Sequence, residues 1–190
     1  MSVPAQRCSR PCAFAEILWL SCVAGISLLS IPAQAADLAL IGGQGDEVTV
    51  GAAAIRMRDW KAWTPGGRWH YALAGEWQVG WWNAQQADAN ASSLVDGSLT
   101  AVLTMRPAEG AKSAHYLEFG FGLHLLSEHE IAEQSLGTRF QFGEFVGAGT
   151  HFGPRRQYAL GARLQHVSNG RIAEPNDGVT FIQLVVRYSF

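Results

Sequence analysis

Hydrophobic and polar residues alternate along most of the chain after Ala36, with the period of two that a β-strand produces. In the stretch 115–127, for example, Leu117, Phe119 and Phe121 are separated by polar or small residues. Turn-forming residues separate the alternating stretches, and no convincing helical period interrupts them. The pattern predicts eight strands, at about 37–45, 48–60, 69–82, 93–106, 115–127, 139–152, 157–169 and 179–190.

The two faces of several predicted strands differ in character, one being apolar and the other polar or small. Most stretches have about a dozen residues, enough to cross a bilayer at the tilt of a barrel strand. We therefore predict an all-β fold, an eight-stranded antiparallel transmembrane β-barrel of the bacterial outer membrane. The alternative is a soluble periplasmic barrel, whose exterior would be lined by glycine and arginine.

The orientation follows from the even number of strands, which places both termini of the chain on the periplasmic side of the membrane. The strand at 157–169 then ends at the cell surface, and the turn at 153–156 is periplasmic. The tryptophans fit two interfacial belts, with Trp60, Trp63 and Trp69 at the periplasmic boundary and Trp81 and Trp82 at the outer one.

The first 35 residues are predicted to be a cleaved signal peptide, which leaves 36–190 as the barrel domain. Arg7 and Arg10 precede a short apolar run, Ile17–Ile31, and Ala33-Gln34-Ala35 forms a small-residue cleavage site. All 3 cysteines fall in this leader, so the mature chain has no disulfide and no thiol nucleophile. The net charge of −2 indicates no nucleic-acid partner.

A histidine and a serine interrupt the apolar face of the seventh predicted strand. His166 and Ser168 lie two residues apart, on the face that also carries Leu160 and Leu164. A serine hydroxyl becomes a nucleophile when a neighbouring imidazole takes its proton. The alternative is a polar cap at the strand end, with both side chains bonded to the loop backbone.

At His166-Val167-Ser168-Asn169 and Pro175-Asn176-Asp177-Gly178 the chain resembles the PagL family of lipid A 3-O-deacylases. The resemblance extends over the mature chain, through the Ala36-Asp37 start, the strand count and the stretch 142–149. It implies a cofactor-independent outer-membrane esterase that removes the ester-linked 3-hydroxyacyl chain at position 3 of lipid A. It assigns Ser168 as nucleophile and His166 as base.

In this family, an acidic residue fourteen positions after the catalytic histidine orients the imidazole. This chain departs from the family at that position. That position is Thr180 here, which can hydrogen-bond the imidazole but cannot stabilise imidazolium by charge. Glu144, on the apolar face of the neighbouring strand, is an alternative acid, because a carboxylate facing lipid is costly. A bulge near Gly143 would instead turn Glu144 into the lumen as an ordinary interior charge. Glu174 and Asp177, in the adjacent loop, remain further alternatives.

The oxyanion of an acyl-transfer intermediate needs hydrogen-bond donors. Asn176 and the backbone at Gly178 are the best candidates by position and by resemblance, followed by Asn169. The alternative for 176–178 is a tight turn. No histidine spacing indicates a metal site, and the acidic stretch 127–133 is interpreted as a solvated loop rather than a divalent-cation site.

Two functions remain open from the sequence. The first is the lipid A esterase, with lipopolysaccharide as substrate. The second is a non-catalytic barrel with a structural or adhesive role, which the Thr180 departure keeps open. The alternating C-terminal strand ends in Phe190, which resembles the signal read by the outer-membrane barrel assembly machinery. A homodimer is left open as a further partner.

Overall fold

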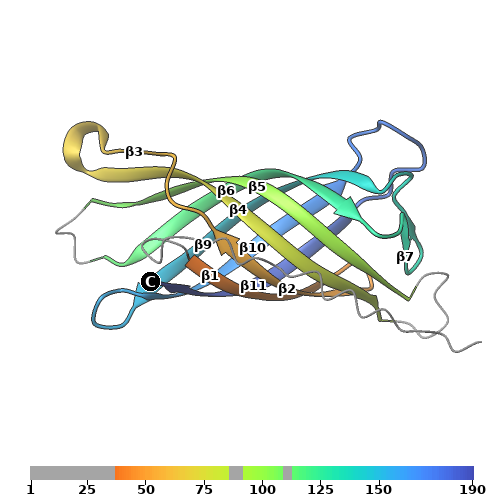
Figure 1. The fold of residues 1–190 in the computed structure, drawn as a ribbon, viewed down its shortest axis with the longest axis horizontal. Coiled ribbons are helices and arrows are strands. Elements are labelled where there is room, and N and C mark those ends of the chain that lie inside the picture. Colours follow the sequence, from red (N-terminus) through yellow and green to blue (C-terminus); the bar gives the residue numbers. More distant parts are fainter. Residues whose placement is uncertain (1–36, 86–91, 109–112) are drawn as a thin grey trace, which may run out of the picture. The chain divides into compact units, whose positions relative to one another are not determined.

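The computed structural model describes residues 37–85, 92–108 and 113–190, and within them an antiparallel sheet closes into a barrel (Figure 1). The signal-peptide prediction lies outside these residues. Eight strands form the described wall, and the pairings of β1 with β11 and of β2 with β4 close it. They are β1 (Asp37–Gly45), β2 (Val48–Arg56), β4 (Trp69–Ala84), β5 (Ser93–Pro107), β6 (His115–Leu126), β9 (Phe140–Phe152), β10 (Tyr158–Ser168) and β11 (Val179–Ser189).

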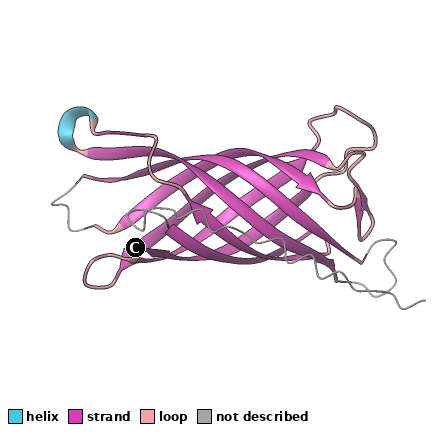
Figure 2. Ribbon diagram, in the orientation of Figure 1, coloured by secondary structure: helices cyan, strands magenta, loops and turns pink. Residues whose placement is uncertain are grey.

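Short elements lie at the two ends of the wall (Figure 2). The end that carries the C-terminus has β3 (Lys61–Trp63) and a 3-10 turn, η1 (Pro65–Gly67). The other end carries the 169–178 loop and a small hairpin of β7 (Glu130–Ile131) and β8 (Gln134–Ser135). Among the residues described, no helix is long and apolar enough to span a membrane.

The predicted strand at 48–60 is interrupted by a bulge. Arg56 pairs with Glu76 and Lys61 with Leu73. An advance of five residues on this strand therefore lies opposite an advance of three residues on β4, so two residues are inserted. A Cβ atom at Gly75 would lie 2.1 Å from the Met57 side chain. The bulge residues therefore pack where β4 has no side chain, and pairing resumes as β3. The other seven predicted strands agree with the structure to within two residues.

The predicted two-faced pattern is confirmed in the wall. Along β6 each odd-numbered residue is exposed and each even-numbered residue is buried. Leu117, Phe119 and Leu125 are exposed on the outside, whereas Glu118 and His124 are buried in the lumen. Apolar side chains outside and charged side chains inside characterise a membrane barrel. The alternative of a soluble barrel is therefore rejected.

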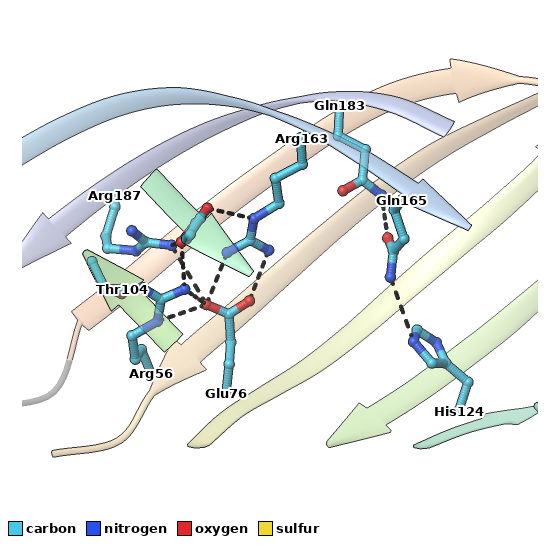
Figure 3. Close-up of polar contacts among 9 residues, drawn as sticks. Arg56, Glu76, Thr104, His124, Arg163, Gln165, Gln183 and Arg187 are labelled. Carbon is cyan, nitrogen blue, oxygen red and sulfur yellow. Dashed lines mark hydrogen bonds and ion pairs between the residues drawn. The ribbon is translucent and has the colours of Figure 1, made fainter. Parts of the chain in front are cut away.

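A buried ionic cluster fills the middle of the lumen (Figure 3). Glu76 accepts hydrogen bonds from Arg56 at 2.7 Å and from Arg163 at 2.8 Å. Glu118 accepts from the same two arginines at 2.9 and 2.8 Å, and Arg187 lies 3.4 Å away. Each carboxylate has several cationic donors, which offsets the cost of removing these charges from water. The cluster ties together five strands.

An apolar layer packs the lumen beneath the 169–178 loop, and it includes Trp82. The prediction that Trp82 belongs to the outer aromatic belt is wrong. Trp81 is 55% exposed, but Trp82 is 1% exposed and packs edge-on against Phe181, with ring centroids 4.8 Å apart. Adjacent strand residues point to opposite faces, so only one of the two can face lipid. Val167 and Val179, in the same layer, are fully buried and fix β10 and β11 where the candidate site begins.

Candidate active site

His166 and Ser168 lie near the end of β10, on its outer face. Both are half-buried, and Val167 between them is fully buried in the lumen layer. The alternation of β10 therefore places the imidazole and the hydroxyl side by side, on the outer wall. This is the placement that the sequence predicts.

The imidazole of His166 is held by Thr180. The two residues are paired across β10 and β11, and His166 Nδ1 lies 2.9 Å from Thr180 Oγ1. A threonine hydroxyl both donates and accepts, so the contact fits either neutral tautomer. With the proton on Nδ1, the imidazole donates to Thr180 and Nε2 carries the free lone pair that a base requires.

Glu144 occupies the corresponding place on the other side of His166. The two residues are paired across β10 and β9, the register of β9 is continuous at Gly143, and Glu144 is exposed on the outer face. In the described part of the chain, however, no hydrogen bond or ion pair joins Glu144 to His166. The geometry thus favours Thr180 over Glu144 as the residue that orients the ring.

Gly178 covers the space beside both side chains. A Cβ atom placed on Gly178 would lie 3.1 Å from His166 Nε2 and 3.3 Å from the Ser168 Cβ. Nε2 and the serine therefore border one small space, which a side chain at position 178 would fill. Gly178 has a φ of +70°, a conformation that glycine adopts at little cost.

Asn169 anchors the 169–178 loop instead of facing the outer wall. It is fully buried, and its Nδ2 donates to the carbonyls of Leu136 and Ala173, both at 2.8 Å. Its backbone N–H donates to Asn176 Oδ1 at 2.8 Å. Because its donors are engaged in the loop, Asn169 is poorly placed to bind an oxyanion. Asn176 uses only its oxygen in this contact, so its NH₂ group remains a candidate donor.

The other loop carboxylates do not contact His166. Asp177 Oδ2 accepts a hydrogen bond from the backbone N–H of Ser135 at 2.8 Å, which ties the loop to β8, and Glu174 is exposed. In the predicted solvated stretch 127–133, Glu128 pairs with Arg139 at 3.2 Å. Within the described ranges, no cluster of three or more His, Cys, Asp and Glu side chains could hold a metal ion.

One residue near the site was missed by the sequence analysis. Asp46, in the turn between β1 and β2, accepts a hydrogen bond from the backbone N–H of Thr180 at 2.5 Å. The two residues are 134 positions apart in the chain. No local pattern could link them, because they meet only when β1 pairs with β11 to close the barrel.

The fold and the outer-wall position of the candidate site define an outer-membrane β-barrel enzyme. A model of the PagL family, described as Lipid A 3-O-deacylase (PagL), matches residues 48–189. The chain is 30% identical over 171 residues to "Lipid A deacylase PagL" of Pseudomonas aeruginosa, covering 86% of this chain and 92% of that protein. It therefore belongs to the PagL family, as the sequence resemblance indicated.

Two further comparisons agree. The protein of the same name from Bordetella bronchiseptica is 30% identical over 132 residues, covering 64% of this chain and 70% of that one. The crystal structure of the outer membrane enzyme PagL superimposes with a TM-score of 0.67 at 21% identity, covering 80% of this chain and 98% of the other. At that identity the superposition supports the barrel fold alone.

Proposed function

We propose that this protein is a serine esterase that removes the ester-linked 3-hydroxyacyl chain at position 3 of lipid A in the outer leaflet. One observation carries the proposal. On the outer wall, His166 is held through Nδ1, while its Nε2 borders the same space as Ser168. A base with one nitrogen fixed and the other facing a space that a serine also borders is suited to activate that serine when its hydroxyl turns toward the base.

The reaction uses these groups in order. Nε2 of His166 takes the proton from Ser168 Oγ as the oxygen attacks the ester carbonyl. The backbone N–H of Gly178 and the amide of Asn176 are candidate donors to the resulting oxyanion. Collapse of the intermediate breaks the ester bond, and the imidazolium gives its proton to the departing sugar oxygen. Water then attacks the acyl-serine, with His166 again acting as base, and releases the fatty acid.

The apolar wall around the site supports a membrane lipid as substrate. Leu164, two residues before His166, is 50% exposed, and Ile182, two residues after Thr180, is 69% exposed. Their side chains would contact hydrocarbon while His166 lies nearer the strand end and the headgroups. A lipid held in the bilayer would thus present its ester bond to the site without a deep binding pocket, because the membrane itself keeps the substrate close to Ser168 and His166.

Mass spectrometry of lipid A tests the proposal directly. Cells that express the protein should lose one 3-hydroxyacyl chain, at position 3, and cells that express Ser168→Ala or His166→Asn should retain it. Ser189→Ala is the matched control, because Ser189 lies at the far end of β11. All variants should keep the heat-modifiable gel mobility of a folded barrel, since neither candidate side chain packs in the lumen. Normal deacylation by Ser168→Ala would contradict the assignment, and unchanged lipid A with wild-type protein would favour a non-catalytic barrel.

A covalent probe separates the serine mechanism from other routes to ester hydrolysis. A fluorophosphonate should label the wild type and Ser189→Ala at Ser168, as identified by peptide mass spectrometry. Labelling should be absent in Ser168→Ala and strongly reduced in His166→Asn, because the hydroxyl then lacks its base. An active enzyme that is never labelled at Ser168 would rule out that residue as the nucleophile.

A further inference from the structure

The turn between β1 and β2 lies directly against the start of β11. Asp46 and Glu47 form this turn with positive φ values of 46° and 62°. A Cβ atom on Gly45 would lie 1.7 Å from the carbonyl oxygen of Thr180, so the turn approaches this backbone as closely as a glycine allows. The position of Asp46 relative to Thr180 is therefore fixed by backbone packing as well as by its hydrogen bond.

Two hydrogen bonds connect this turn to the imidazole. Asp46 Oδ2 accepts from the backbone N–H of Thr180 at 2.5 Å, and Thr180 Oγ1 lies 2.9 Å from His166 Nδ1. Asp46 is thus the carboxylate bonded to the very residue that holds His166. The series runs from His166 through Thr180 to Asp46, and it ends in a negative charge.

Other charged groups lie near His166, but none of those in the described ranges has this connection. Glu144 faces it from β9 without a hydrogen bond to the ring, and Asp177 is bonded to the backbone of Ser135. The other charged side chains that the structure describes near this end are exposed in the same turn, in the 169–178 loop and between β6 and β9, or are paired in the lumen: Glu47, Arg171, Glu174, Glu128, Glu130, Glu133 and Arg139, and the buried Asp96, which is bonded to His124.

We propose that Asp46 is a positioning residue of the active site, which fixes Thr180 and supplies the negative charge that Thr180 lacks. An imidazolium forms as the serine is deprotonated, and a nearby carboxylate stabilises that cation. Because Asp46 is exposed and acts through Thr180, its effect is smaller than that of an acid bonded to the ring itself. The residue lies two positions before the range that the family model matches.

This inference rests on the proposed function, and its test uses the same deacylation assay on detergent-purified full-length barrel. Asp46→Asn keeps an oxygen for the Thr180 N–H and tolerates the positive φ, but removes the charge. We expect kcat to fall about tenfold with KM nearly unchanged, within the range that support of a general base supplies. The acidic limb of the kcat/KM profile should move to lower pH, because the protonated imidazole has lost its counter-charge. Glu47→Gln, the same loss of charge one residue away, should change neither quantity.

A rescue variant separates charge from turn geometry. Thr180→Glu places a carboxylate beside His166, so it should restore most of the lost rate in the Asp46→Asn background. Asp46→Asn with wild-type kcat and pH profile would overturn the inference, even if Asp46→Ala were impaired, because the residue would then only shape the turn. Ser168→Ala is assayed in parallel: if the wild type has no activity, or if Ser168→Ala keeps it, the proposed function fails as well. An inactive Ser168→Ala beside a fully active Asp46→Asn overturns this inference alone.

Discussion

His166 Nδ1 and Thr180 Oγ1 lie 2.9 Å apart, across the pairing of β10 with β11. The contact comes from two side chains on the same outer face of adjacent strands. A neutral hydroxyl can thus orient the imidazole where a carboxylate is absent. It does so without the charge that stabilises an imidazolium.

Replacing Thr180 tests this contact. Thr180→Val keeps the shape of the side chain but removes the hydrogen bond, so the ring loses its fixed orientation and kcat should fall about tenfold or more. Thr180→Ser keeps the hydroxyl and should retain most of the activity. Initial rates of lipid A deacylation by purified protein provide the measurement. Equal rates for the valine and serine variants would show that the hydrogen bond has no part in turnover.

Glu144→Gln should change the rate by less than about threefold, because no hydrogen bond of Glu144 supports His166. Its effect should add to that of Thr180→Glu in a double-mutant cycle. The same kinetic assay measures all four proteins. A loss of tenfold or more, coupled to Thr180, would mean instead that Glu144 serves the histidine.

Gly178→Ala should abolish most of the activity without unfolding the barrel. Its new methyl group would lie 2.8 Å from His166 Cε1, in the space where the ester must enter. Gly170→Ala is the matched control, since Gly170 lies in the same loop with a similar φ of +63° but meets only the ring of Phe142. Both alanines carry a comparable backbone strain of about 1 kcal/mol. Similar activities for the two variants would exclude a steric role for Gly178 at the site.

Glu118→Gln should destabilise the barrel by about 3–5 kcal/mol, because it leaves Arg56 and Arg163 partly uncompensated in the lumen. The temperature at which the heat-modifiable gel band converts to the unfolded form should therefore drop. Glu128→Gln breaks an exposed pair with Arg139 and should cost less than about 1 kcal/mol. Equal conversion temperatures for the two variants would show that the cluster contributes little to stability.

Deleting Phe190 should reduce the amount of assembled barrel in the outer membrane, while turnover per assembled molecule stays normal. Phe190 is 64% exposed at the end opposite the site and packs edge-on against Tyr188, with centroids 5.0 Å apart. Phe190→Tyr keeps an aromatic ring and should assemble. Quantified folded protein in outer-membrane fractions, compared with its deacylase rate, distinguishes the two effects. Full assembly after the deletion would contradict an assembly signal at this residue.

The sequence alone predicts seven of the eight strands to within two residues and the faces of their side chains. Alternation is local, since each residue of a strand points opposite to its neighbours whatever pairs with it. For that reason His166 and Ser168 could be placed together on the outer face before any strand pairing was known. Trp82 is predicted to lie in the outer belt because it is a tryptophan, whereas its place in the alternation of β4 puts its side chain in the lumen.

Pairing, register and closure are decided only in the tertiary structure. Arg56 and Glu76 meet in the lumen because they are partners across β2 and β4, and the stagger of the barrel brings Arg163 of the non-neighbouring β10 to the same level. Thr180 meets His166 through the register of β10 with β11, and Asp46 reaches Thr180 through the closing pair of β1 with β11. A local alternation with a period of two gives no information about which residues 134 positions apart will be in contact. The chain by itself thus determined the wall and the serine–histidine pair, and barrel closure decided which groups support that pair.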